Sequence, residues 1–161
     1  MNSVYDQFRM EGNVAYLLSR ARVALVRAFD AALADLDITS GQGSILMMLA
    51  SGRFTTAAEL AREMYADSAA MTRMLDRLER RGLVTRSRHG ADRRVMQLDL
   101  TAEGKKLARR LPQRYKAVID SHFAGFTAAE LDTLKMLLRK TLGDEARLAD
   151  AGMDGNTYPK S

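Results

Sequence analysis

The chain has 161 residues, 47% of them hydrophobic, enough for one domain with a core or for one domain with a dimerisation extension. Its formal charge of +5 favours polyanionic partners without identifying them. Cysteine is absent, which excludes disulfides, thiolate metal sites and switches that work by cysteine oxidation.

The N-terminal region begins with unpatterned residues, 1–10, which we expect to form a short arm. Over residues 11–36 the apolar side chains return every three or four positions, which predicts one long helix. This helix exceeds what one small domain needs. We favour a helix shared between a dimer interface and the next domain, the alternative being a core helix that happens to be long.

Two short helices are predicted next from their starting signals. Thr39 with Gln42 and Thr56 with Glu59 fit the capping box, in which two side chains satisfy free N–H groups of the first turn. Gly52 ends the first of these helices, and AAELAREM forms the second.

Residues 67–82 are predicted to form the helix around which this domain is organised. Asp67 or Ser68 is suited to the N-cap, and Gly82 to a left-handed C-cap. Four apolar residues at helical spacing form one stripe: Met71, Met74, Leu75 and Leu78. The opposite face is polar and basic: Ser68, Thr72, Arg73, Asp76, Arg77 and Arg80.

Two strand-like segments follow, at residues 83–88 and 94–100, with the turn residues HGAD between them. From residue 73 to residue 94 there are eight arginines, no lysine and three acidic residues, a net charge of +5. A polar helix face followed by an arginine-tipped hairpin is typical of a helix laid in the DNA major groove with a loop touching the next groove. The alternative is a solvated helix face followed by an ordinary β-turn.

The C-terminal region is predicted to hold two more helices. Thr101 caps a long basic helix, in which Pro112 is expected to cause a kink. The basic residues of this helix serve either solubility or, at its start, the DNA backbone. Thr127 and Glu130 form a third capping box before a leucine-striped final helix, and residues 150–161 are expected to be a flexible tail.

Four motifs in this order, AAELAREM, DSAAMTRMLDRLERRGLVTR, ADRR and LDLTAEGKKL, resemble the multiple-antibiotic-resistance regulator (MarR) family. The resemblance implies a fold that is mainly α with a small β-wing, a winged helix-turn-helix domain flanked by N- and C-terminal dimerisation helices. We expect residues 1–36 to be the N-terminal arm and dimerisation helix, residues 37–100 the DNA-binding domain and residues 101–149 the C-terminal dimerisation helices. Ala69 and Ala70 depart from the family, because many relatives place hydroxyl residues there.

The apolar helix faces outside the winged domain predict a homodimer, because a monomer rarely leaves such large apolar patches exposed. Two recognition helices related by a two-fold axis would meet half-sites about one helical turn apart, on a palindromic stretch of double-stranded DNA. We therefore expect a sequence-specific transcriptional regulator, of the repressor type.

The candidate DNA contacts come from the predicted recognition helix and the wing. Arg73 and Arg77 are the first candidates for contact with the groove that holds the helix, and either Arg93 or Arg94 is expected to enter the minor groove. The full set is Ser68, Ala69, Ala70, Thr72, Arg73, Arg77, Arg86, Arg88, His89, Arg93 and Arg94.

The resemblance also implies a small aromatic acid or phenolic effector that releases the DNA, with a ligand-independent regulator as the alternative. Arg20 would pair with a carboxylate, and methionines adapt to flat rings. The candidate lining residues are Ser19, Arg20, Val23, Gln42, Ile45, Met71 and Met74. The alternative for these residues is an ordinary role in core and surface.

Other classes of protein fit the sequence less well. The two histidines, His89 and His122, lack metal-ligand spacing, and neither a phosphate loop nor a nucleophile elbow is present, so we expect no enzyme, metal or cofactor. A winged-helix scaffold that binds protein would show exposed aromatic residues or leucines where this chain has arginines. RNA binding lacks an aromatic platform. No apolar run approaches the ~20 residues that span a bilayer and no signal peptide is evident, so we expect a cytoplasmic protein without a membrane partner.

Overall fold

The structure is a computed structural model that describes residues 12–88 and 96–143. The chain divides into two compact units, residues 1–122 and residues 123–161.

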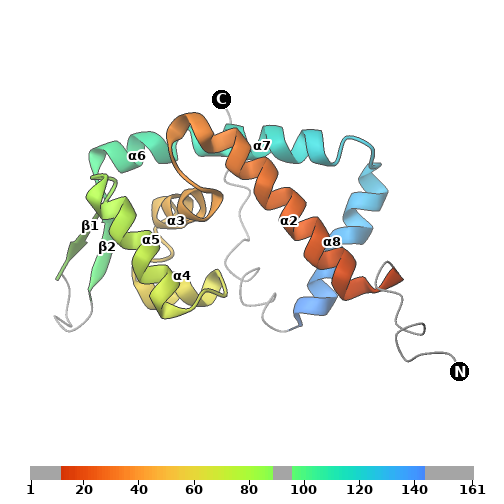
Figure 1. The fold of residues 1–161 in the computed structure, drawn as a ribbon, viewed down its shortest axis with the longest axis horizontal. Helices are drawn as coiled ribbons and strands as arrows, with labels where there is room; N and C mark the ends of the chain where they lie inside the picture. The colour runs from red at the N-terminus through yellow and green to blue at the C-terminus, as the bar shows by residue number, and fades with distance from the viewer. Residues whose placement is uncertain (1–11, 89–95, 144–161) are drawn as a thin grey trace, which may run out of the picture. The chain divides into compact units, whose positions relative to one another are not determined.

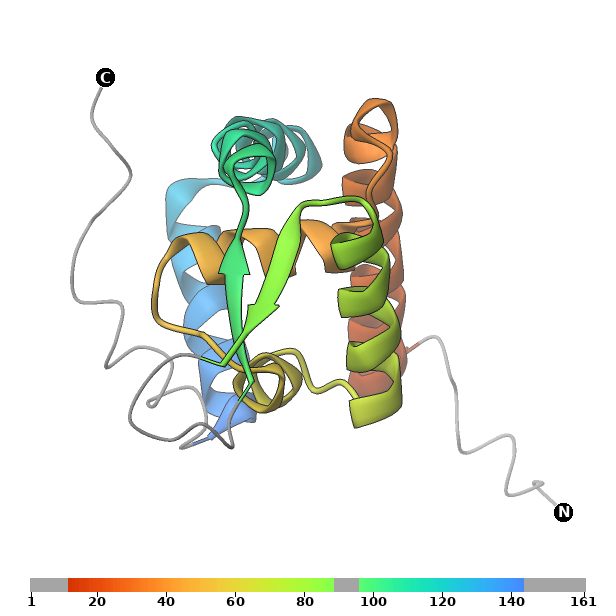
Figure 2. The ribbon, with the colours of Figure 1, turned by 90° about the vertical axis from the view of Figure 1, so that its left-hand side faces the viewer.

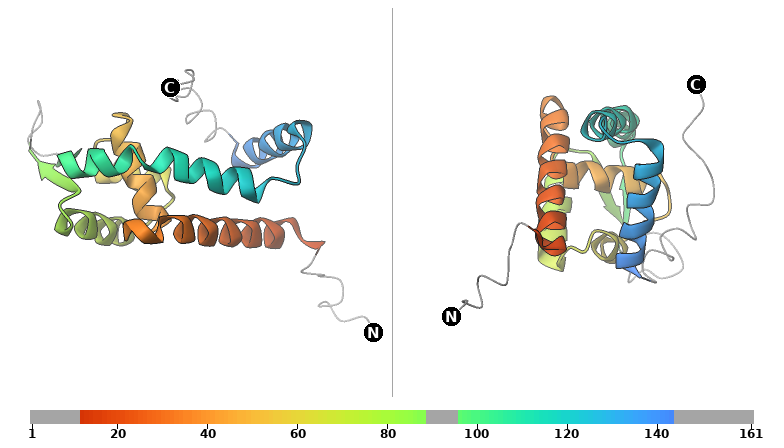
Figure 3. Two further views of the ribbon diagram at one scale, coloured as in Figure 1. Left: turned by 90° about the horizontal axis from the view of Figure 1, so that it is seen from above. Right: turned by 90° about the vertical axis from the view of Figure 1, so that its right-hand side faces the viewer.

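The first unit is built from helices and one hairpin. Its helices are α2 (Val14–Leu33), the short 3-10 helix η2 (Ala34–Leu36), α3 (Ser40–Ala50), α4 (Ala57–Glu63), α5 (Ser68–Arg80), α6 (Ala102–Ala108) and α7 (Leu111–His122). Strands β1 (Val84–Ser87) and β2 (Gln97–Leu100) pair antiparallel, with Val84 opposite Leu100. Helix α5 packs against α4 and β1, while α7 lies alongside α2 (Figures 1 and 3).

Local capping residues set the starts of the helices, as the sequence predicts. Capping boxes with both reciprocal hydrogen bonds begin α3 at Thr39 and α4 at Thr56. Asp67 caps α5 by accepting a hydrogen bond from the Ala70 N–H at 2.7 Å. At the other end of α5, Gly82 has φ +65°, and the N–H groups of Gly82 and Leu83 bond back to Glu79 and Leu78. This pattern satisfies the last carbonyls of the helix and favours glycine.

The core joins the helix-turn-helix to the end of α2. Its fully buried side chains come from α2, α3, α4, α5 and α7: Leu33, Ile45, Leu46, Leu60, Met71, Leu75, Leu78 and Leu111. Tyr115 of α7 closes one side, since its hydroxyl donates to the Ser40 carbonyl at 3.0 Å and its ring lies 4.7 Å from that of Phe29. Burial raises the pKa of the Tyr115 hydroxyl, so it stays a neutral donor.

The base of the hairpin is bonded to the start of α6, and β2 leads directly into that helix (Figure 2). The Thr101 hydroxyl donates to the Gly82 carbonyl at 2.6 Å, and the Thr101 N–H donates to the Leu83 carbonyl at 3.1 Å. A Cβ on Gly104 would lie 1.9 Å from the Leu83 carbonyl oxygen, so this position has no room for a side chain. The motifs RGLV and LTAEG are therefore two halves of one joint.

The structure differs from the sequence prediction after the wing. The long helix predicted from Thr101 onward is two helices, α6 and α7, separated at Arg109 and Arg110. Pro112 is the second residue of α7, where its missing N–H costs nothing, so the interruption precedes the proline. The strands are also shorter than predicted, and Arg94 lies outside the described residues.

The described part of the second unit holds helix α8 (Ala128–Leu142), which begins at the predicted Thr127–Glu130 capping box. The rings of Phe123 and Phe126 meet edge to face at 5.4 Å before it. No side chain of α8 is buried. Across the described residues of both units, every helix is too short or too polar to cross a membrane.

Candidate nucleic-acid interface

Helices α4 and α5 form a helix-turn-helix whose turn is fixed by local bonds. Tyr65 has φ +49°, and the Ala66 N–H donates to the Ala61 carbonyl at 2.9 Å, which redirects the chain into α5. Glu59 ties down the segment before α4, because its carboxylate accepts the N–H groups of Thr55 and Thr56 at 2.8 and 2.9 Å. The hydrogen bond from Thr55 holds the pKa of Glu59 below its usual value.

Helix α5 has one buried and one exposed face, as the sequence predicts. Met71, Leu75 and Leu78 are at most 1% exposed. The exposed side carries Ser68, Ala69, Thr72, Arg73, Arg77 and Arg80, while Ala70 is half-buried. The Thr72 hydroxyl donates to the Ser68 carbonyl at 2.8 Å, which leaves its oxygen available as an acceptor.

Arg73 and Arg77 lie one helical turn apart on this exposed face. Neither guanidinium has a hydrogen bond or an ion pair to a described residue. Two free guanidiniums on an exposed helix can reach phosphates or the acceptor edge of guanine.

Arg86 has a different surrounding from the one that the sequence suggests. Its guanidinium lies 2.6 Å from the Asp76 carboxylate and 3.2 Å from that of Glu79, and its side chain is only 27% exposed. These ion pairs join β1 to α5, so Arg86 positions the wing against the helix.

The rest of the wing is described only at its base. Arg88 is exposed, and the Ser87 hydroxyl donates to the Asp99 carboxylate at 3.2 Å. The predicted contacts His89, Arg93 and Arg94 lie outside the described residues.

A hollow of about 450 Å³ lies between the corner after α2, the start of α3 and the last turn of α5. Arg77 and Arg80 of α5 and the following residue Arg81 line one side of it, and Asp37 and Gln42 line the other side from the corner and α3. Arg81 has no role that a local sequence pattern could have indicated, because its partner Asp37 lies 44 residues away along the chain.

The residues predicted to hold an effector are spread over different environments. Ser19, Arg20 and Val23 are exposed on α2, and Arg20 donates to the Tyr16 hydroxyl at 3.1 Å. Ile45 and Met71 are core residues with almost no exposed surface, so packing in the domain interior already occupies both side chains. Met74 is half-buried, and Gln42 lines the hollow.

The chain is similar to known proteins of one family. The family model described as MarR family matches residues 38–96. The multiple antibiotic resistance protein MarR of Salmonella typhimurium is 30% identical over 142 residues, covering 88% of this chain and 96% of that protein.

Two solved structures show the same fold. A mutant of MarR from E. coli complexed with operator DNA is similar with a TM-score of 0.76 at 27% identity, covering 87% of this chain and 99% of that one. CouR from Rhodococcus jostii RHA1, bound to p-coumaroyl-CoA, has a TM-score of 0.72 at 27% identity, covering 86% of this chain and 95% of that one.

Proposed function

Because the chain belongs to the MarR family of winged-helix transcriptional regulators, we propose that it represses transcription as a homodimer bound to a palindromic operator. Helix α5 is the recognition helix in this proposal, and the wing contacts the neighbouring groove. The proposed contacts are Ser68, Ala69, Ala70, Thr72, Arg73, Arg77, Arg88, His89, Arg93 and Arg94.

The observation that carries this proposal is the exposed face of α5. Its underside is packed into the core through Met71, Leu75 and Leu78, so the helix is held rigidly while Arg73 and Arg77 are left without partners among the described residues. A rigid helix with unpaired guanidiniums is what base readout in the major groove requires, and the similar MarR of E. coli was crystallised with operator DNA.

Exposed apolar side chains support the homodimer. They lie on α2 at Val14, Leu17, Leu18, Val23 and Val26, and on α8 at Met136, Leu137, Leu138 and Leu142. A second copy that covers both helices would remove these faces from water and place two recognition helices on one duplex.

Selection from a pool of genomic DNA fragments tests the proposal and yields the operator. On that operator Arg73→Ala is expected to cost about 1–3 kcal/mol and to change which base pairs are preferred. Arg93→Ala with Arg94→Ala should weaken binding to every sequence and reduce the salt slope by about 2. Arg110→Ala, which removes an exposed arginine outside the helix-turn-helix and the wing, is the control for lost charge.

Failure of the wild-type protein to enrich any fragment would overturn the proposal and favour a winged helix that binds protein instead. An unchanged salt slope in the double variant would remove the wing from the DNA interface.

The regulator is further proposed to release its operator when it binds a small aromatic acid or phenol. The similar CouR was crystallised with p-coumaroyl-CoA, and Arg20 on the exposed face of α2 offers a partner for a carboxylate. Titration of the free dimer with salicylate and p-coumarate should raise its Tm and lower its operator affinity together. An unchanged Tm and an unchanged operator affinity with both acids would favour a regulator that works without these effectors.

A further inference from the structure

The corner between α2 and α3 is a sharp turn with carbonyl groups to satisfy. Asp37 has φ +53°, and its N–H closes η2 by donating to the Ala34 carbonyl at 3.1 Å. The chain then re-enters a helix at the Thr39 capping box. The last carbonyls of a helical segment have no partner within it, so the carbonyls of Leu36 and Asp37 need donors from elsewhere.

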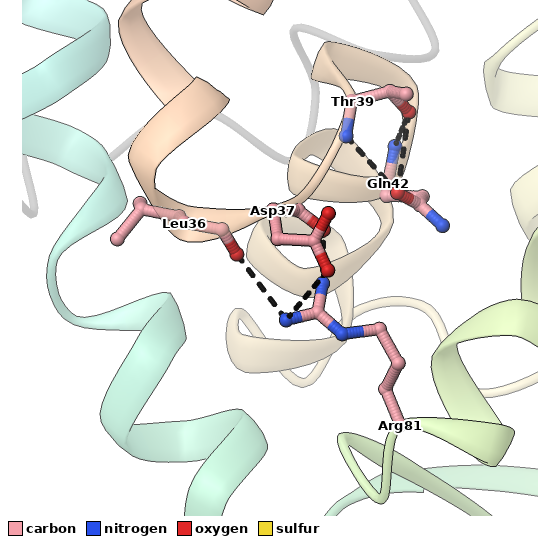
Figure 4. Close-up of polar contacts among 5 residues, drawn as sticks. All are labelled: Leu36, Asp37, Thr39, Gln42 and Arg81. Carbon is pink, nitrogen blue, oxygen red and sulfur yellow. Dashed lines mark hydrogen bonds and ion pairs between the residues drawn. The ribbon is translucent and has the colours of Figure 1, made fainter.

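Arg81 supplies those donors, as Figure 4 shows. Its Nη2 donates to the Leu36 carbonyl at 3.2 Å, and its Nη1 donates to the Asp37 carbonyl. The Asp37 carboxylate lies 3.8 Å from Nη2, so a charge also faces the guanidinium. A planar guanidinium that spans two carbonyls fixes orientation as well as distance.

The backbone of Arg81 is itself held at the end of α5. Its N–H donates to the Arg77 carbonyl at 3.2 Å, and the glycine turn that follows bonds back to Glu79 and Leu78. The corner and the last turn of α5 are therefore joined through one side chain, that of Arg81.

We propose that Arg81 is a positioning residue that sets the orientation of the recognition helix relative to α2, and so fixes the half-site spacing that the dimer accepts. This inference rests on the proposed function, in which α2 carries part of the dimer interface.

Arg114 provides a matched control within the same corner. From α7 it donates to the Ala32 carbonyl at 3.2 Å and pairs with the Asp35 carboxylate at 2.7 Å. Its chemistry and target segment match those of Arg81, but it attaches the corner to α7 and not to α5.

Operators whose half-sites are moved one base pair closer or farther provide the first readout. Wild-type protein should prefer one spacing, and Arg81→Ala should reduce that preference roughly fivefold or more, the size of an ordinary coupling between sites. Arg114→Ala should leave the preference within about twofold, although both variants lower the Tm. The salt slope should stay unchanged in Arg81→Ala, because the residue is assigned no phosphate contact.

A second readout needs no DNA and remains available if Arg81→Ala folds poorly. Because the chain has no cysteine, Thr85→Cys, at the exposed position of β1, gives one spin-label site per protomer. The distance distribution between the two labels of the full-length dimer should broaden with Arg81→Lys, which cannot span both carbonyls, and stay narrow with Arg114→Lys.

Three results would overturn the proposal: an unchanged spacing preference, a salt slope lowered by about 1 in Arg81→Ala, or equal broadening by both lysine variants. A wild-type protein that binds no DNA would refute the proposed function instead, and the label distances would still test the link between the corner and α5.

Discussion

Helices α5 and α8 share a design and differ in what covers them. Both begin at a side chain that caps the first turn, and both carry apolar residues at helical spacing. In α5 the stripe is buried, with Leu75 only 1% exposed, whereas in α8 Leu137 and Leu142 are 51% and 50% exposed. Periodicity in the sequence therefore identifies the helix face that must be covered, but it does not identify what covers that face. For α5 the cover is the chain itself, and for α8 we propose that it is a second copy.

The largest effect is expected from Gly104→Ala, a change beside the turn that ends α5, the helix whose apolar face the chain covers itself. The new Cβ would meet the Leu83 carbonyl oxygen, a backbone atom that cannot move aside cheaply, and so would force the joint of RGLV and LTAEG apart. We expect a loss of about 3 kcal/mol in the free energy of unfolding, measured by urea denaturation. Gly125→Ala is the control, because a Cβ there meets nothing within 4 Å. Equal stability of the two variants would contradict the packing described for Gly104.

A smaller effect is expected from Leu137→Lys, a change on the helix whose apolar side chains are left exposed. A lysine on the exposed stripe of α8 should weaken the dimer by about tenfold or more, since a charge would have to be desolvated on association. Sedimentation at several concentrations measures this change. The amide exchange of α5 should stay protected, because its core does not include α8 side chains. An unchanged dimer would show that the stripe has another cover.

The smallest effect is expected from Glu59→Gln, which compares the capping boxes of α4 and α8. The pKa of Glu59 is lowered in the folded protein, so its contribution is present above the unfolded value near 4.5 and is lost as pH falls through the folded pKa. The variant should be less stable by under about 1 kcal/mol at pH 7 and equal to wild type in acid. Thermal unfolding followed from about pH 3 to about pH 7 tests the direction of this pH dependence of stability. Glu130→Gln should show the same direction, because the pKa of Glu130 is also lowered.

Much of this architecture could be predicted from the sequence, because the signals are local. Thr39, Thr56, Asp67 and Thr127 mark helix starts through bonds that reach only three residues ahead. The buried face of α5 follows from spacing alone. Family membership was likewise predicted correctly from the order of the four motifs.

The rest could not be predicted, because it depends on partners brought together by the fold. Arg86 belongs by sequence with the other wing arginines, yet Asp76 and Glu79 occupy its guanidinium. Ile45 and Met71 have the residue types of a ligand pocket, but both side chains are buried in the core. The effector residues and the wing-tip contacts remain predictions.

The locked base of the hairpin has a consequence for how such proteins can change. Thr101 and Gly104 contact Gly82 and Leu83 at the base of the hairpin, next to the paired residues Val84 and Leu100, so the ends of the two strands are held from outside the hairpin. Lengthening a loop costs little when its ends are already fixed. A change in the length or sequence of the segment between the two strands is therefore expected to leave the pairing of Val84 with Leu100 intact, which would let new groove preferences be grafted onto this scaffold.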